Sequence, residues 1–518
     1  MQQTARSHSS ANLAGLELEH LERFGTYTRL HFEDRSYTNL DEFRFAGALA
    51  RLLDAYGVRS GDRVLVMMPN SPELTACFSA IWTLGASIVP VIPQWTAGEV
   101  ANILINSEAS IILTAPSHAV RLEEALRQAR TEQRLLVFGE SEATGATNIL
   151  PELDGLAPVE TPADRSESDM SVLLYTSGTT AKPKGVVLTH GNLMSALDGA
   201  YRQNPDLQRG AMLHCLPLTH VYGVLVQHLA NMWGWNTVLM RHFEPARALE
   251  AIERHRVRYL PVVPTMAVYL LHHPERGRFD TASLFRITSG GAALPDQLRR
   301  DLEAAFQCRV DQGYGLSESA SVATGYEVAR PYRAGSVGQA VPGVDLCILS
   351  DNNEPLPAGQ IGEICVAGPN VTQGYWRDAA ATSQALSGRW LRTGDVGYLD
   401  EEGYLFITDR KKDLIIKGGE NISPREIEEA LYLHPAVAEA AVVGVPDPVF
   451  GEQIYAVVQL VPDSQATEEE IRQHVTKYVT RFKVPARVVL VPSLPKNNSG
   501  KILKRDLREK LAAVAQPV

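Results

Sequence analysis

Hydrophobic and polar residues in the first part of the chain follow a pattern that predicts helices alternating with short buried strands. A helical period begins after Thr38, includes Phe43 and Leu49, and ends at Gly57. Thr38 precedes Asp41 by three residues, which is the spacing of a helix capping box. Strand-like apolar runs follow at 63–68, 87–92, 110–114 and 134–138. Because strands separated by helices pair in parallel, this pattern predicts an α/β fold with sheets covered on both faces.

The pattern changes beyond about residue 340. Turn-rich segments at 351–355 and 399–404 predict hairpins, and hence a β-rich subdomain over about 340–409. A small α+β unit follows, whose first helix is expected to start at Ser423 with Pro424 at its first position and Glu426 completing a capping box. A second helix near 467–479 lies among strand-like runs at 437–444, 454–461 and 487–491. The expected division is therefore a large unit over 1–409 and a small unit over 414–518.

Composition and charge exclude several classes of protein. The chain has 518 residues, of which 45% are hydrophobic and 21% charged, as in folded proteins of about two to four structural units. The formal net charge of −11 gives no reason to expect binding to nucleic acid or to an anionic membrane. Five dispersed cysteines without a CxxC pair indicate neither a disulfide framework nor a zinc site. The N-terminus lacks an apolar signal region, and no apolar run reaches about 18 residues, so we expect no transmembrane segment and a reducing, cytoplasmic location.

One stretch of this acidic chain is basic. Between residues 481 and 510 there are nine lysines and arginines against two acidic residues. Two interpretations remain open: a solvated amphipathic tail, or a lid that faces phosphate groups.

The densest chemical signal is the segment 174–188, a strand-like entry, a loop rich in hydroxyls and glycine, and a strand-like exit. Gly178 lets the backbone approach a ligand closely, and Lys182 or Lys184 can offset charge on a polyphosphate. The hydroxyl donors are Thr176, Ser177, Thr179 and Thr180. The loop is not a Walker A loop, because Gly185 is followed by Val186 and not by Lys-Ser/Thr. The sequence therefore predicts a phosphate-binding loop.

With four further motifs, this loop resembles the adenylate-forming superfamily of acyl-CoA synthetases, adenylation domains and luciferases, and it is most similar to acyl-CoA ligases. The further motifs, in the family's order, are Gly313-Tyr-Gly-Leu-Ser-Glu318, Thr393-Gly-Asp395, Asp409-Arg410 and Ser499-Gly-Lys501. The resemblance covers about residues 38–510. It implies a large N-terminal adenylation domain, a hinge over 410–413 at Lys412, and a small mobile C-terminal lid domain over 414–518.

The resemblance also implies a set of residues around ATP. The loop would hold the β- and γ-phosphates, although Ala181 stands where the family usually has glycine. Glu318 would hold Mg²⁺, unless it is only a favourable charge at a helix N-terminus. Ser317, in place of a commoner threonine, would contact the α-phosphate. The ATP-binding set is Thr176, Ser177, Gly178, Thr179, Thr180, Lys184, Gly291, Ala292, Tyr314, Ser317, Asp395 and Arg410.

Catalysis in the family has two half-reactions, and the resemblance assigns residues to both. Lys501 would offset negative charge as a carboxylate attacks the α-phosphate of ATP. In the second half the small domain rotates and a thiol attacks the acyl-adenylate. Lys417, Gly418 and Gly419 resemble the segment that lines the coenzyme A channel, with a plain glycine turn as the alternative. ATP, Mg²⁺ and coenzyme A are therefore the expected cofactors and co-substrates.

The acid pocket is expected around His220, Val221 and Gly291, with His220 near the reacting carboxylate. Amino-acid-activating relatives carry an aspartate where this chain has Val221. An unpaired buried ammonium would be costly there. The sequence thus favours a fatty or aromatic acid over an α-amino acid.

Two alternative functions remain to be weighed. The acceptor could be an acyl or peptidyl carrier protein, which the basic stretch could meet, in place of coenzyme A. A serine hydrolase is disfavoured, because Gly315-Leu-Ser-Glu-Ser319 lacks the final glycine of a nucleophile elbow.

Overall fold

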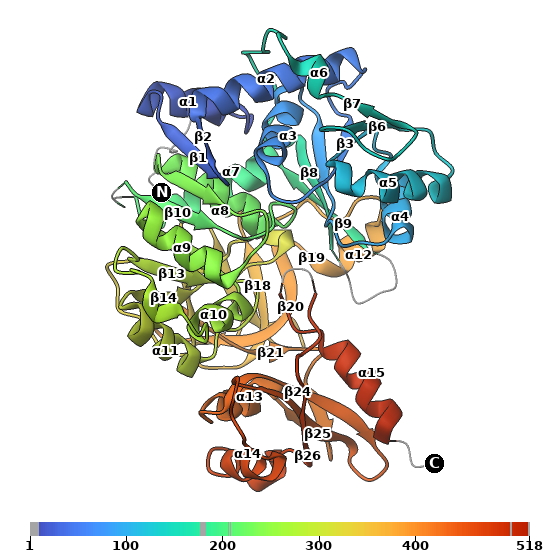
Figure 1. Ribbon diagram of the computed structural model, residues 1–518. Coiled ribbons are helices and arrows are strands. Elements are labelled where there is room, and N and C mark those ends of the chain that lie inside the picture. The colour runs from blue at the N-terminus through green and yellow to red at the C-terminus, as the bar shows by residue number, and fades with distance from the viewer. Residues whose placement is uncertain (1–9, 177–182, 206, 208, 498–499, 516–518) are drawn as a thin grey trace.

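The computed structural model describes residues 10–176, 183–205, 207, 209–497 and 500–515, and within this part the chain forms four β-sheets. Three sheets belong to the part of the chain before residue 411, and the fourth lies in a separate C-terminal unit, orange to red in Figure 1. The α/β prediction, with a large N-terminal part and a smaller C-terminal unit, is confirmed.

The first two sheets are predominantly parallel, as the alternation of strands and helices predicts. One has the order β14-β13-β12-β10-β11-β1-β2 and the other β7-β6-β5-β3-β4-β8-β9, with antiparallel pairing only at β1–β2 and β8–β9. The first comprises β1 (Thr28–Phe32), β2 (Arg35–Thr38), β10 (Ala211–His214), β11 (Asn236–Leu239), β12 (Val257–Val262), β13 (Arg286–Ser289) and β14 (Arg309–Gln312). The second comprises β3 (Arg63–Met67), β4 (Ser87–Pro90), β5 (Ile111–Thr114), β6 (Arg134–Val137), β7 (Ala146–Asn148), β8 (Met170–Thr176) and β9 (Lys184–Thr189).

Helices cover both sheets, because each buries an apolar stripe against them. Thr38 and Asp41 form the predicted capping box at the start of α2. The longer helices are α1 (Gly15–Phe24), α2 (Asn39–Ala55), α3 (Pro72–Thr83), α4 (Ala97–Ser107), α5 (Pro116–Ala129), α7 (His190–Gln203), α8 (Val221–Met232), α9 (Pro245–His255), α10 (Pro264–Leu271) and α11 (Asp296–Phe306). Trp233 and Trp235 are buried in the core cluster that also contains α8 residues.

The third sheet is antiparallel and corresponds to the predicted β-rich subdomain. Its strands are β15 (Thr324–Gly325), β16 (Ser336–Ala340), β17 (Asp345–Leu349), β18 (Gly362–Ala367), β19 (Leu386–Ser387), β20 (Trp390–Leu399) and β21 (Tyr404–Arg410). The sheet begins at Thr324, before the expected start near residue 340. The early strands are short or rich in glycine and polar residues, and such segments carry no clear apolar alternation.

The C-terminal unit follows the predicted α+β pattern. It contains β22 (Ile415–Lys417), β23 (Glu420–Ile422), α13 (Pro424–Tyr432), β24 (Val437–Asp447), β25 (Gly451–Leu460), α14 (Glu468–Val475), β26 (Arg487–Leu490) and α15 (Lys504–Ala515). Figure 1 shows α13 below α11, at the junction with the large unit. There the backbone N–H of Asp296 donates to Glu429 over 3.2 Å.

The capping box expected at α13 is wrong. Ser423 occupies the N-cap position, but its hydroxyl donates to the Thr408 carbonyl and to the Asp409 carboxylate, both at 3.0 Å. Asp409 accepts the Arg425 N–H over 3.2 Å, and Glu426 forms an ion pair with Lys483. A carboxylate from β21 therefore caps this helix, which the local spacing of Ser423 and Glu426 could not indicate.

Among the residues that the structure describes, no helix is both long and apolar enough to cross a membrane.

Candidate active site

In the β8–β9 hairpin, Thr176, at the end of β8, pairs with Lys184, at the start of β9, and these two residues flank the predicted phosphate loop in sequence. Ser177, Gly178, Thr179 and Thr180 lie outside the described residues. The Lys184 ammonium stands 5.3 Å from the centre of the Tyr375 ring, a cation–π contact. The hairpin therefore places Thr176 and Lys184 side by side at the mouth of the loop.

Glu318 lies beside this hairpin, in the short 3-10 helix Ser317–Ser319 that also carries Ser317. The Tyr375 hydroxyl donates to the Glu318 carboxylate over 2.7 Å. A single oriented carboxylate next to a phosphate-binding loop fits Mg²⁺, which takes one or two carboxylates together with phosphate oxygens and water. Among the described residues no cluster of three or more metal-binding side chains occurs.

Tyr375 is a site residue that the sequence did not reveal. It forms an isolated antiparallel bridge with Val186 of β9, although almost two hundred residues separate them along the chain. The sequence around it, Gly374-Tyr375-Trp376, has no charged group and is typical of an ordinary aromatic turn.

The proposed adenine and ribose residues are joined by hydrogen bonds. The Tyr314 hydroxyl donates to one Asp395 oxygen over 2.7 Å, and Arg410 Nε lies 2.9 Å from the other. Asp395 is 3% exposed, since β20 holds it between its two partners. Burial first, and the Asp395 charge second, raise the pKa of the Tyr314 phenol well above its usual value. Three residues from distant motifs thus share one buried carboxylate.

Gly291 and Ala292, which are expected at the nucleotide and acid sites, follow β13 in the chain. Gly291 has a φ of +79°, which favours glycine. A Cβ on Gly291 would lie 3.6 Å from Val263, and one on the preceding Gly290 would lie 2.9 Å from the Tyr222 ring. The two glycines therefore leave room for Tyr222 and for whatever binds above Gly291.

Lys501, from the C-terminal unit, lies close enough to His220, from the large unit, for its charge to act on the imidazole. Burial first, and then the charge of Arg410, lower the pKa of the Lys501 ammonium to about 8. Burial first, and then the Lys501 charge, lower the pKa of His220 to about 4. His220 Nδ1 accepts the backbone N–H of Tyr222 over 3.2 Å. The imidazole is thus neutral at pH 7 with its proton on Nε2, which is free to donate to a carboxylate.

The predicted acid pocket is apolar where amino-acid-activating relatives carry a charge. Val221 is 3% exposed and belongs to the main core cluster. Tyr222 is the next residue of α8, and its hydroxyl donates to the Thr288 carbonyl over 3.3 Å. The Tyr222 ring, which the sequence did not single out, is thereby fixed beside Gly290.

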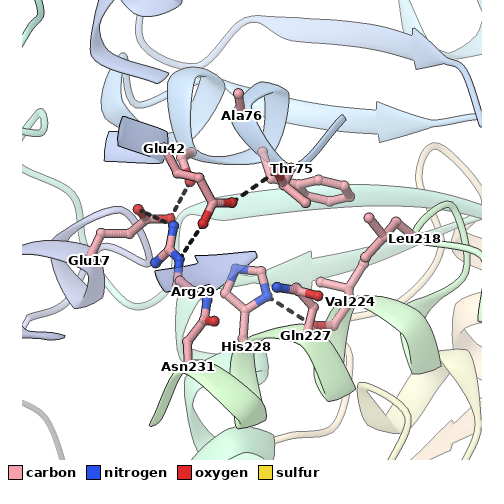
Figure 2. A pocket seen from close by; sticks show the side chains of 12 residues that line it. Glu17, Arg29, Glu42, Thr75, Ala76, Leu218, Val224, Gln227, His228 and Asn231 are labelled. Carbon is pink, nitrogen blue, oxygen red and sulfur yellow. Dashed lines mark hydrogen bonds and ion pairs between the residues drawn. The ribbon is translucent and has the colours of Figure 1, made fainter. Parts of the chain in front are cut away.

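A cavity of about 20 Å³ lies behind α8, with room for about one water molecule. Figure 2 shows Arg29 between Glu17 and Glu42, with ion-pair distances of 3.2 and 2.6 Å. Val224 and His228 of α8 line the cavity. At about 100° per residue, Tyr222 points about 160° away from Val224. This buried network therefore lies on the side of α8 opposite Tyr222 and on the same side as Val221, which precedes Val224 by three residues and His228 by seven.

Lys412 of the proposed hinge lies within electrostatic range of Arg410, Asp395 and Lys501. Lys412 is exposed between β21 and β22, in a turn where Asp413 N–H donates to Arg410 O over 2.9 Å. Lys417 is buried, and its ammonium donates to the Phe482 carbonyl over 2.7 Å. Gly418 and Gly419 both have positive φ and form the turn between β22 and β23. Gly418 and Gly419 thus form a glycine turn, and their role in a coenzyme A channel stays a prediction.

The basic stretch 481–510 does not form one open cationic surface. Lys496 and Lys504 form ion pairs with Glu439 and Glu428 over 2.5 and 2.7 Å. Lys483, Arg505 and Arg508 are also paired with acidic residues. Lys501, in contrast, faces Arg410 and Asp395. Lys501 thus faces the nucleotide residues, as the lid interpretation predicts, whereas five of the other eight basic residues are ion-paired.

Comparisons with known proteins agree with this geometry. The model of the AMP-binding enzyme family matches residues 18–376, and that of the AMP-binding enzyme C-terminal domain matches residues 426–501. A long-chain-fatty-acid–CoA ligase of Bacillus subtilis is 34% identical over 94% of this chain and 92% of its own length. A feruloyl-CoA synthase of Amycolatopsis is 35% identical over 90% of this chain and 92% of its own.

A solved structure gives the same result for the fold. ATP-bound MatB from Rhodopseudomonas palustris has a TM-score of 0.88 and is 28% identical, with 98% of this chain and 100% of that chain covered. The chain therefore belongs to the AMP-binding enzyme family within the adenylate-forming superfamily, and it is an AMP-forming acid–CoA ligase.

Proposed function

We propose that the acid is uncharged apart from its carboxylate, either fatty or aromatic, and that Lys501 serves its adenylation. The convergence of Lys501 with His220 and with the Tyr314–Asp395–Arg410 group carries this proposal. The buried Val221 supports the choice of acid, because an α-ammonium would find no partner there. Relatives that act on a long-chain fatty acid and on a feruloyl group support the same range.

In the first half-reaction, a carboxylate oxygen attacks the α-phosphorus of ATP, an O–P bond forms, and the bond to pyrophosphate breaks. Neutral His220 donates from Nε2 and orients the acid, while Lys501 offsets charge on the phosphoryl oxygens. Asp395 accepts the ribose hydroxyls, and Tyr314 contacts the adenine. Thr176, Lys184 and Ser317 bind phosphate oxygens. Glu318 would hold Mg²⁺, which would offset further charge on the triphosphate when bound.

In the second half-reaction, the sulfur of coenzyme A attacks the acyl carbon and loses its proton, a C–S bond forms, and AMP leaves. We propose that residues 414–518 rotate about 410–413 and bring Lys417, Gly418 and Gly419 to the thiol path. The exposed apolar residues Ile416, Val449 and Phe450 support a docking role for this face of the unit. In the present arrangement Lys501 is at the site, which corresponds to the first half-reaction.

A panel of acids tests the proposal. Purified protein with ATP and Mg²⁺ should release pyrophosphate with fatty or aromatic acids and not with α-amino acids. Addition of coenzyme A should convert the adenylate to a thioester detected by mass spectrometry. Preference for an α-amino acid would contradict the assigned pocket. Thioester formation only on a carrier protein would support the alternative acceptor, which the ion pairs of the basic stretch disfavour.

A further inference from the structure

The segment that carries Lys501 is a narrow hairpin, which we call the lysine hairpin, residues 495–497 and 500–503. Lys496 and Ile502 form an antiparallel bridge, and Leu503 N–H donates to Pro495 O over 2.9 Å. The Lys501 N–H donates to Asn497 Oδ1 over 2.9 Å. The backbone of Lys501 is therefore fixed within the hairpin, and the placement of its ammonium depends on what the hairpin rests on.

The lysine hairpin rests on α10 of the large unit at two points. The Thr265 hydroxyl donates to the Gly500 carbonyl over 2.7 Å. The Lys496 ammonium donates to the Tyr269 hydroxyl over 3.3 Å and lies 5.1 Å from the centre of its ring. Thr265 and Tyr269 are four residues apart on one helix face. The Thr265 contact holds the hairpin next to Lys501, and the Tyr269 contact holds its base.

Gly500 packs closely against the large unit, with little space for a side chain. Its φ is +80°, and a Cβ at this position would lie 3.0 Å from Val263 Cγ2. Val263 is also the residue nearest to Gly291. The tip of the lysine hairpin and the wall of the proposed substrate site thus touch the same valine, so the position of α10 determines how far Lys501 reaches.

Charge alone does not hold Lys501 in place. Arg410 and Lys412 repel its ammonium, whereas Asp395 and Asp413 attract it. Asp395 is already paired with Arg410, so a neutral anchor is needed until substrate anions arrive. The contact of Thr265 with Gly500 is of that kind, because a hydroxyl–carbonyl hydrogen bond involves no charged group.

We propose that Thr265, assisted by Tyr269, is a positioning residue that holds the lysine hairpin for adenylation and releases it before thioester formation. This inference rests on the role proposed above for Lys501. Neither residue touches the reacting atoms, so its effect should reach the chemistry only through the lysine. It should also be confined to one half-reaction, because a rotated C-terminal unit no longer contacts α10 in the same way.

The test compares Thr265→Val, which removes the hydroxyl at nearly constant volume, with Thr265→Ser, which retains it. We expect Thr265→Val to slow single-turnover adenylation roughly tenfold, as loss of one well-formed hydrogen bond. Thioester formation from supplied acyl-adenylate should be unchanged, and Thr265→Ser should restore adenylation. Tyr269→Phe should give a smaller loss in the same half-reaction. Equal loss in both half-reactions, or no rescue by serine, would overturn the proposal.

A double variant separates this inference from the proposed function. If Lys501→Ala leaves adenylation intact, the role of Lys501 is wrong. If Lys501→Ala slows adenylation but Thr265→Val does not, only the positioning role is wrong. When Thr265 acts through Lys501, adding Thr265→Val to Lys501→Ala should cause no further loss. An independent tenfold loss in the double variant would contradict the inference.

Discussion

Tyr314 and Asp395, 81 residues apart in sequence, are joined by a hydrogen bond of 2.7 Å that links the motif proposed for adenine to the motif proposed for ribose. Arg410 binds the other oxygen of the same carboxylate. Because Asp395 is buried, neither partner can be exchanged for water without loss. The carboxylate thus orders both sides of the proposed nucleoside site before ATP arrives.

This arrangement predicts unequal effects of substitution. Asp395→Asn keeps the shape but removes the charge, so kcat/KM for ATP should fall about a hundred-fold, as for a hydrogen-bonded ion pair. Tyr314→Phe removes one donor and should cost about tenfold or less. ATP–pyrophosphate exchange at varied ATP measures both. Equal small losses would show that the carboxylate does not organise the site.

Adenylation should depend on the protonation of Lys501. The pKa of Lys501 is lowered to about 8, so its side chain is positively charged below that pH and loses the charge as the pH rises above 8. The kcat/KM for adenylation should therefore decline above about pH 8. Lys501→Arg should remove this decline, since arginine stays charged. An unchanged alkaline limb in Lys501→Arg would assign the titration to another group.

The hinge proposed at Lys412 predicts a loss confined to the second half-reaction. Proline restricts φ to about −65°, so Lys412→Pro should slow thioester formation at least tenfold and leave single-turnover adenylation nearly unchanged. Lys412→Ala, which keeps backbone freedom, is the matched control. Unchanged partial rates in the proline variant would remove residues 410–413 from the mechanism.

The hydrogen bond from Tyr375 to Glu318 predicts an effect on metal binding, which can be measured without catalytic turnover. Its hydroxyl orients Glu318, so Tyr375→Phe should weaken Mn²⁺ binding in the presence of a non-hydrolysable ATP analogue several-fold, as measured by electron paramagnetic resonance. Glu318→Gln should weaken it further. If both variants bound Mn²⁺ as tightly as the wild-type protein, Glu318 would not be part of the metal site.

A reversible cross-link tests movement of the C-terminal unit. A Cβ on Gly500 would lie 3.7 Å from the Thr265 Cβ, within the usual disulfide range of about 3.5–4.5 Å. The Thr265→Cys/Gly500→Cys variant, once oxidised, should form acyl-adenylate but no thioester, and a reductant should restore the second step. Its reduced form and the single variants are the controls. Rapid thioester formation by the cross-linked protein would show that rotation is not required.

Much of the fold was predictable because it depends on local signals. The runs at 63–68 and 110–114 become β3 and β5 of a parallel sheet, and Thr38 caps α2 as its spacing with Asp41 indicates. The spacing of Ser423 and Glu426 wrongly predicted a capping box at α13, because the Asp409 carboxylate from a neighbouring strand accepts an N–H at the start of this helix. Local rules hold when no distant group competes for the same donors.

The individual motifs in the sequence identify the type of chemistry: a phosphate loop, an acceptor carboxylate after Gly394, a lysine on a glycine-containing loop. They do not say which motifs meet, because contacts such as Tyr314 with Asp395, Tyr375 with Glu318 and Thr265 with Gly500 join segments whose separation in the chain carries no spatial information. Folding brings these partners within hydrogen-bonding distance. The strength of a buried polar contact arises from that proximity and from exclusion of water, neither of which is encoded at any single position.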